Sequence, residues 1–203
     1  MRPAPFLVFL SLFAAGTAMA APQAAPAPRH PARPADPAAP RPSEVVSEDQ
    51  LFARLAKAES REDAKPIEEK LEAMFRASGS PSVDLLMNRA EVAAAADDKA
   101  MARKLLESVT TIAPKFAEGW HARAALETAS GDDTSALISL QKVVLLNPRQ
   151  FNALNELAGM LEDYGDKAGA LKLYRRALAL DPQLEGVEHH LRALTRQVEG
   201  QDI

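Results

Sequence analysis

The spacing of apolar and polar residues repeats every 34 positions over the second half of the chain. Pro114, Pro148 and Pro182 mark the period, and the positions around them keep their size class in every copy. The matching sets are Leu86, Trp120 and Leu154; Ala90, Ala124 and Ala158; Ala102, Ala136 and Ala170; Leu106, Leu140 and Tyr174; and Val109, Val143 and Ala177. A fixed period of this length is typical of a repeat architecture. The units are predicted to span 83–116, 117–150 and 151–184.

Each unit is predicted to fold as two antiparallel helices. In the last unit, apolar residues at i, i+3, i+4 and i+7 form one stripe over 154–161, and a facing stripe covers 170–178. Between the stripes, Gly165 can adopt the left-handed backbone that ends a helix, and Asp166 can cap the next helix. The alanine columns predict close packing of the paired helices, because larger side chains would separate the backbones. Trp120 is predicted to be a buried aromatic residue.

Further helices are predicted on both sides of the three units. Residues 43–82 carry a capping box at 47–50 and two apolar segments, which look like a degenerate fourth unit. Residues 185–203 are predicted to hold a terminal capping helix, because repeat arrays need a cover for their last apolar edge. Its apolar face consists of Val187, Leu191, Leu194 and Val198.

The units resemble tetratricopeptide repeats. The last unit is the most similar, through Leu157, Ala158, Gly165, Ala170, Tyr174, Ala177 and Pro182. The first two units depart from the family pattern at Arg89, Ala93, Asp97, Arg123 and Glu127. The resemblance implies an all-α, right-handed superhelical solenoid of three clear repeats, with a degenerate N-terminal helix pair and a C-terminal capping helix. The whole chain is similar to small exported tetratricopeptide proteins of alphaproteobacteria.

The first 42 residues are predicted to direct export and to act as a spacer. Arg2, an uncharged apolar run over 6–15 and the Ala18-Met19-Ala20 sequence are typical of a secretory signal peptide, 1–20, cleaved after Ala20. An uncleaved signal that anchors the protein in the inner membrane is the alternative. Residues 21–42 hold eight prolines and eight alanines, which predicts a disordered linker. The expected location is therefore the periplasm or the exterior.

Composition and motifs argue against several classes of chemistry. The chain of 203 residues has no cysteine, and its formal net charge of −4 is unfavourable for nucleic-acid binding. No nucleophile, nucleotide-binding or zinc-hydrolase motif is present, so we expect no enzyme activity and no cofactor or metal. His189 and His190 are adjacent on a helix and therefore point about 100° apart. The acidic pairs Asp97–Asp98 and Asp132–Asp133 are interpreted as helix caps.

The resemblance implies that the first helix of each unit lines a concave groove for a partner segment. The expected groove residues are Asp84, Met87, Glu91, Glu118, His121, Asn152, Asn155 and Glu162. This set contains acids, amides and a histidine but no lysine or arginine. It therefore predicts a neutral or basic protein segment as the partner, rather than the acidic C-terminus that the carboxylate-clamp members of the family bind. The alternative is that these are merely solvated polar positions.

Together these features predict a non-enzymatic interaction or assembly module of the periplasm that holds an extended or helical partner segment. No small-molecule substrate is evident in the sequence. The alternative is a regulatory or scaffolding subunit of an envelope enzyme complex, tethered to the membrane by an uncleaved signal.

Overall fold

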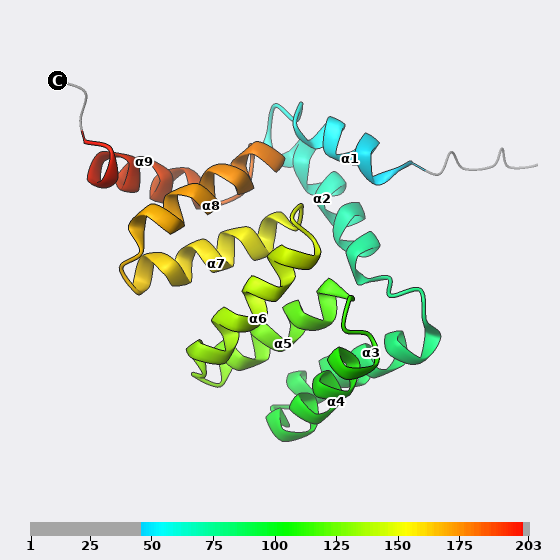
Figure 1. The fold of residues 1–203 in the computed structure, drawn as a ribbon. Helices are drawn as coiled ribbons and strands as arrows, with labels where there is room; N and C mark the ends of the chain where they lie inside the picture. Colours follow the sequence, from blue (N-terminus) through cyan, green and yellow to red (C-terminus); the bar gives the residue numbers. More distant parts are fainter. Residues whose placement is uncertain (1–45, 201–203) are drawn as a thin grey trace, which may run out of the picture. The chain divides into compact units, whose positions relative to one another are not determined.

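The computed structural model describes residues 46–200, and all regular structure in that range is helical (Figure 1). The predicted all-α class is confirmed. The signal peptide 1–20 and the linker 21–42 lie outside the described residues. None of the helices within 46–200 is long and apolar enough to span a membrane. The helices are α1 (Glu48–Leu55), α2 (Arg61–Arg76), α3 (Pro81–Ala95), α4 (Lys99–Ile112), α5 (Ala117–Ala129), α6 (Asp133–Leu146), α7 (Phe151–Asp163), α8 (Lys167–Leu180) and α9 (Val187–Val198).

The helices α3 to α8 form three successive antiparallel pairs, α3–α4, α5–α6 and α7–α8. In each pair an aspartate caps the second helix by accepting a hydrogen bond from the backbone N–H three residues later. The distances are 3.0 Å for Asp98, 3.2 Å for Asp132 and 2.9 Å for Asp166. The predicted capping roles of Asp98 and Asp132 are confirmed. A side-chain oxygen satisfies a backbone donor that a helix start otherwise leaves unpaired.

The turn inside each pair needs one residue with a left-handed backbone. Gly131 and Gly165 supply it with φ of 73° and 86°, as predicted for Gly165. Asp97 occupies the equivalent place in the first pair, with φ of 56°. Residues with a Cβ pay an energetic cost in this region that glycine does not. The first pair is therefore closed by a strained turn.

The alanine columns of the repeat lie in the interior of the array. Ala90, Ala102, Ala124, Ala136, Ala158 and Ala170 are all buried. Trp120 differs from the prediction of a buried aromatic residue, because it is only half-buried. Its Nε1 donates a hydrogen bond to the carbonyl of Pro114 at 3.1 Å, and the Arg123 guanidinium carbon lies 5.5 Å from the centre of the ring. The indole thus packs against the core of the second unit while keeping part of its surface exposed.

The N-terminal hairpin, α1–α2, is not stacked as a unit before α3–α4. Its buried side chains Leu51, Phe52, Leu55, Ala64 and Leu71 join the apolar cluster of the third unit. Asp49 pairs with Arg149 at 2.5 Å, and Gln183 Nε2 donates to the carbonyl of Ala58 at 3.2 Å. The predicted N-terminal helix pair is therefore present, but it packs on the third unit and not in front of the first.

The C-terminal helix α9 covers the third unit. Val187 and Leu194 are fully buried in the same cluster, and Leu191 packs against it, whereas Val198 is exposed. Arg175 on α8 makes two hydrogen bonds to the carboxylate of Glu199, at 2.6 and 2.7 Å. The predicted capping helix is confirmed.

Candidate functional site

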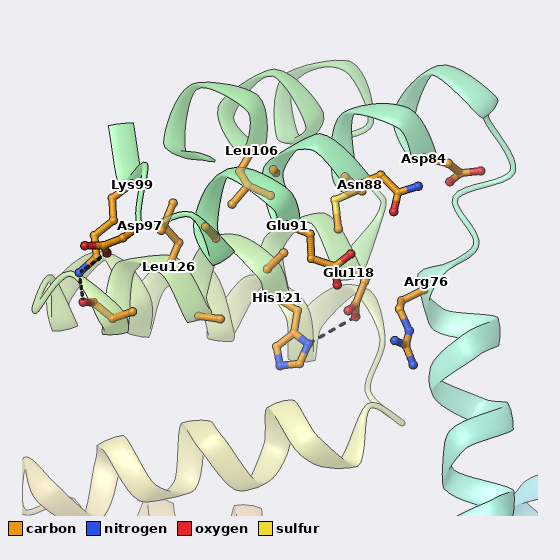
Figure 2. Close-up of a pocket in the computed structure, with 16 residues that line it drawn as sticks. Arg76, Asp84, Asn88, Glu91, Asp97, Lys99, Leu106, Glu118, His121 and Leu126 are labelled. Carbon is orange, nitrogen blue, oxygen red and sulfur yellow. Dashed lines mark hydrogen bonds and ion pairs between the residues drawn. The ribbon is translucent and has the colours of Figure 1, made fainter. Parts of the chain in front are cut away.

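A cavity of about 740 Å³ lies between α3 and α5, with contributions from the end of α2 and from α4 (Figure 2). Both long walls are first helices of their pairs. The lining residues are Arg76, Asp84, Met87, Asn88, Ala90, Glu91, Ala94, Asp97, Lys99, Leu106, Glu118, His121, Ala122, Ala125, Leu126 and Ala129.

The walls are apolar and their side chains are mostly small. Five of the lining residues are alanines, and Met87, Leu106 and Leu126 supply the larger apolar surface. Small side chains on two facing helices leave room between them, because alanine adds only a methyl group to each backbone. The arrangement suits an apolar segment of a ligand, since ligand sites are commonly apolar with a few polar groups that fix orientation.

Five of the eight predicted groove residues line this cavity: Asp84, Met87, Glu91, Glu118 and His121. Asn152 lines a smaller adjoining cavity of about 200 Å³, which also includes Glu91, Glu118 and His121. Asn152 there donates to Oε1 of Glu72 on α2 at 2.9 Å. Asn155 is half-buried and lines neither cavity.

Glu162 is occupied elsewhere in the fold. Its Oε2 accepts a hydrogen bond from the hydroxyl of Tyr174 at 3.1 Å and lies 2.9 Å from Nδ1 of His190. These contacts join α7 to α8 and to the capping helix. The structure therefore separates Glu162 from the cavity between α3 and α5.

His121 lies at the junction of the two cavities between two carboxylates. Its Nδ1 is 3.4 Å from Oε2 of Glu118, a contact drawn as a dashed line in Figure 2, and its Nε2 is 3.1 Å from Oε1 of Glu156 on α7. Burial disfavours the imidazolium, but the hydrogen bonds and negative charges of Glu118 and Glu156 outweigh it and raise the pKa of His121 to about 10. The imidazole is therefore cationic at neutral pH.

Gln150 holds Glu118 from the opposite side. The residue is only 3% exposed, and its Nε2 donates to Oε2 of Glu118 at 2.8 Å. The same Nε2 lies 3.0 Å from Nδ1 of His121, so the amide contacts both members of the ion pair. The carboxylate of Glu118 is thus occupied by its contacts with His121 and Gln150.

Two cations that the sequence interpretation missed also line the cavity. Arg76 ends α2 and lies 3.3 Å from Glu72, whereas Lys99 begins α4, donates to the carbonyl of Ala129 at 2.8 Å and lies 3.9 Å from Asp97. The expectation of a groove without lysine or arginine is wrong. That expectation considered only the first helix of each unit, and both residues come from other elements.

The remaining carboxylates differ in how they are paired. Asp84 accepts hydrogen bonds from the hydroxyl and the backbone N–H of Ser78, the latter at 3.1 Å. The side chain of Glu91 is exposed and makes no hydrogen bond or ion pair with any residue of the range 46–200. No group of three or more His, Asp or Glu side chains in the described part of the chain could hold a metal ion. Among the carboxylates that line the cavity, Glu91 is thus the one whose side chain has no partner in the described residues.

Comparisons with known proteins agree with this architecture. No family model matches the chain. A tetratricopeptide repeat-containing protein of Rhizobium etli is 27% identical over 152 residues, which cover 75% of this chain and 74% of that protein. The first TPR of Spaghetti (RPAP3), bound to the HSP90 peptide SRMEEVD, has a TM-score of 0.53 at 16% identity and covers 58% of this chain and 93% of its own. The Yersinia enterocolitica chaperone SycD, in complex with a peptide of the translocator YopD, has a TM-score of 0.52 at 16% identity, with 58% and 95% covered.

The fold is therefore that of a tetratricopeptide-repeat solenoid, an architecture in which stacked helix pairs bury one continuous core. The sequence resemblance is confirmed, and the curated relative comes from an alphaproteobacterium, as the resemblance anticipated.

Proposed function

We propose that this protein is a non-enzymatic interaction module that binds an extended or helical segment of another protein in the cavity between α3 and α5. The observation that carries the proposal is the cavity itself, about 740 Å³ with apolar walls between the first helices of two successive repeats. Two proteins of the same fold support it, since one was solved with an HSP90 peptide and the other with a translocator peptide.

The partner segment is proposed to be neutral or basic. Arg76, Lys99 and His121 are each paired with a carboxylate in the structure, whereas Glu91 has no such partner within 46–200. A lysine or arginine of the partner would find in Glu91 an unpaired countercharge beside an apolar wall. An acidic C-terminus would meet the unpaired carboxylate of Glu91 instead, which is unfavourable.

A binding assay tests the proposal directly. The probes are two fluorescein-labelled dodecapeptides of alternating alanine and leucine that differ only in carrying two lysines or two glutamates. The lysine peptide is expected to bind the full chain at least ten times more tightly than the glutamate peptide. Ala122→Phe should abolish binding by filling the cavity, and Glu91→Gln should reduce the preference for lysine.

The matched control is Ala179→Phe, because Ala179 is exposed on α8 and lies outside the cavity. Circular dichroism establishes that each variant is folded. Equal affinity for both peptides would contradict the charge preference, and binding that survives Ala122→Phe would contradict the cavity as the site.

The proposed place of action is the periplasm, on the strength of the signal-like residues 1–20. Mass spectrometry of the mature N-terminus tests this, with Ala21 as the expected first residue. A chain that begins at Met1 would favour the second candidate, a membrane-tethered scaffolding or regulatory subunit of an envelope enzyme complex.

A further inference from the structure

One stripe of α3 lies outside the cavity and exposes two large apolar side chains with an arginine between them. Leu85, Arg89 and Val92 follow one another at i, i+4 and i+7, so they share a face of the helix. Leu85 is 58% exposed and Val92 is 71% exposed.

The repeat shows what the same positions do elsewhere in the chain. The equivalents of Val92 are Leu126 in the second unit and Met160 in the third. Leu126 is only 6% exposed and belongs to a cluster with Ala102 and Leu106 of the preceding unit. Met160 packs against the apolar cluster that contains Leu140 and Val143 of the second unit.

The positions equivalent to Leu85 are also buried in the later units. Its equivalents are Gly119, where a Cβ would lie 2.6 Å from Cγ1 of Val109 on α4, and the fully buried Ala153. In both later units this position therefore packs against the second helix of the unit before it. The stripe on α3 is the equivalent stacking surface of the first unit. No helix pair of residues 46–200 covers it, because the hairpin α1–α2 packs with the third unit instead.

We propose that the stripe Leu85–Arg89–Val92 is an interaction surface that stacks on an amphipathic helix of another protein, one with an acidic side chain beside its apolar face. The apolar residues expected on that helix can be inferred from the contacts between successive units of this chain. Against the next unit, α4 presents Ala102, Leu106 and Val109, at i, i+4 and i+7, and α6 presents Leu140 and Val143 at the positions equivalent to Leu106 and Val109.

The acidic side chain follows from the arginine in the stripe. The equivalent residue of the second unit, Arg123, donates from Nε to Oε1 of Glu127 at 2.7 Å. Arg89 has Ala93 at the corresponding i+4 position and makes no ion pair within 46–200. A partner helix that brings a carboxylate would supply what Glu127 supplies to Arg123.

A second copy of this chain fits the surface less well. Head-to-tail stacking would need an open rear edge, but α9 covers that edge with Val187 and Leu194 buried beneath it. A symmetric pairing of two α3 stripes would place Arg89 against the partner copy's identical arginine, with no carboxylate in the stripe to compensate. The symmetric pairing therefore leaves the arginine without a carboxylate partner.

The probe for this surface is a helix-stapled, fluorescein-labelled peptide that copies residues 132–148, made once with Ser139→Glu and once with Ser139→Lys. The acidic probe is expected to bind the full chain at least ten times more tightly than the basic one. Val92→Glu in the chain should weaken binding of the acidic probe at least tenfold, and Arg89→Glu should reverse the preference between the two probes. Leu145→Glu is the control, because Leu145 is 74% exposed on α6, outside the stripe.

The proposal is independent of the cavity, and Ala122→Phe should leave this binding unchanged. Binding that Val92→Glu does not weaken, or a probe preference that Arg89→Glu does not alter, would overturn it. Static light scattering measures whether the chain forms a dimer. A dimer of the unmodified chain that Val92→Glu dissociates would show that a second copy occupies the stripe, and would also overturn the proposal.

Discussion

Nε2 of His121 on α5 lies 3.1 Å from Oε1 of Glu156 on α7, so one charged contact joins the second repeat to the third beside the candidate binding cavity. The other ring nitrogen faces Glu118. The imidazolium is therefore held between two carboxylates. Its protonation affects both the stability of the array and the charge beside the cavity.

This arrangement predicts a stability that falls at alkaline pH. The pKa of His121 is raised in the folded state to about 10, against about 6.5 in an unfolded chain. A raised histidine pKa contributes stability that is fully present below pH 6.5 and is lost as the pH rises through 10. We expect the free energy of unfolding to drop by roughly 2 kcal/mol between pH 6.5 and 9.5, a magnitude reduced by the partial exposure of Glu156.

Urea denaturation of the full chain at a series of pH values measures this drop. His121→Asn should remove the dependence within this window while lowering stability at pH 6.5. The control is His189→Asn, because His189 is exposed on α9. An identical pH profile for the unmodified chain and His121→Asn would contradict the charged contact.

A second prediction concerns the carboxyl group by which the hairpin α1–α2 meets the third repeat. Burial, the hydrogen bond to Asp181 and the charge of Asp181 raise the pKa of Glu68 to about 7, although Arg61 opposes them. The folded state therefore holds this proton more tightly than the unfolded chain, with its pKa of 4.5. The favourable contribution is present below pH 4.5 and is lost as the pH rises through 7.

Glu68→Gln is accordingly expected to leave stability unchanged near pH 5 and to increase it at pH 8 by about 1 kcal/mol, because it removes a buried negative charge beside Asp181. Thermal unfolding at the two pH values tests this, and a gain of that size corresponds to roughly 2–4 °C. Glu69→Gln, an exposed neighbour on α2, is the matched control. Lower stability of Glu68→Gln at pH 8 would show that the pair with Arg61 outweighs the repulsion.

The repeat could be predicted from the sequence because its determinants are local and periodic. Asp98, Asp132 and Asp166 cap their helices through backbone groups three residues away, and Gly131 and Gly165 form their turns without distant contacts. Such features depend on neighbours in the chain, so the spacing alone is enough to place them.

The position of the hairpin could not be predicted in the same way. The apolar stripe of Leu51, Phe52 and Leu55 shows that α1 is buried, but it does not show which surface covers it. That choice depends on Phe151, whose ring lies 6.5 Å from the ring of Phe52 although 99 positions separate the two in the chain. The roles of Arg76 and Lys99 in the cavity, and the loss of Glu162 from it, depend likewise on tertiary packing.

The strained turn of the first repeat gives a third prediction. Asp97→Gly should increase the free energy of unfolding by about 0.5–1 kcal/mol, because glycine adopts the left-handed backbone without steric cost. The ion pair that Asp97 makes with Lys99 spans 3.9 Å and is mostly exposed, so its loss should matter little. Gly165→Asp, the converse change in the third repeat, should destabilise. Chemical denaturation of both variants decides the matter, and a destabilising effect of Asp97→Gly would refute the strain.

Two of the three members of one repeat column give the last prediction. Trp120 and Leu154 are equivalent by the 34-residue period, yet Leu154 is completely buried and Trp120 is only half-buried. Trp120→Ala should therefore cost about 1–2 kcal/mol, which is less than a fully buried aromatic loses, because the indole keeps part of its surface in water. Leu154→Ala should cost roughly 3–4 kcal/mol, since it leaves a cavity in the core shared with the hairpin. Guanidinium denaturation of the two variants side by side provides the comparison. A larger loss for the tryptophan variant would mean that the indole, through its hydrogen bond to Pro114, carries more of the second repeat than its exposure indicates.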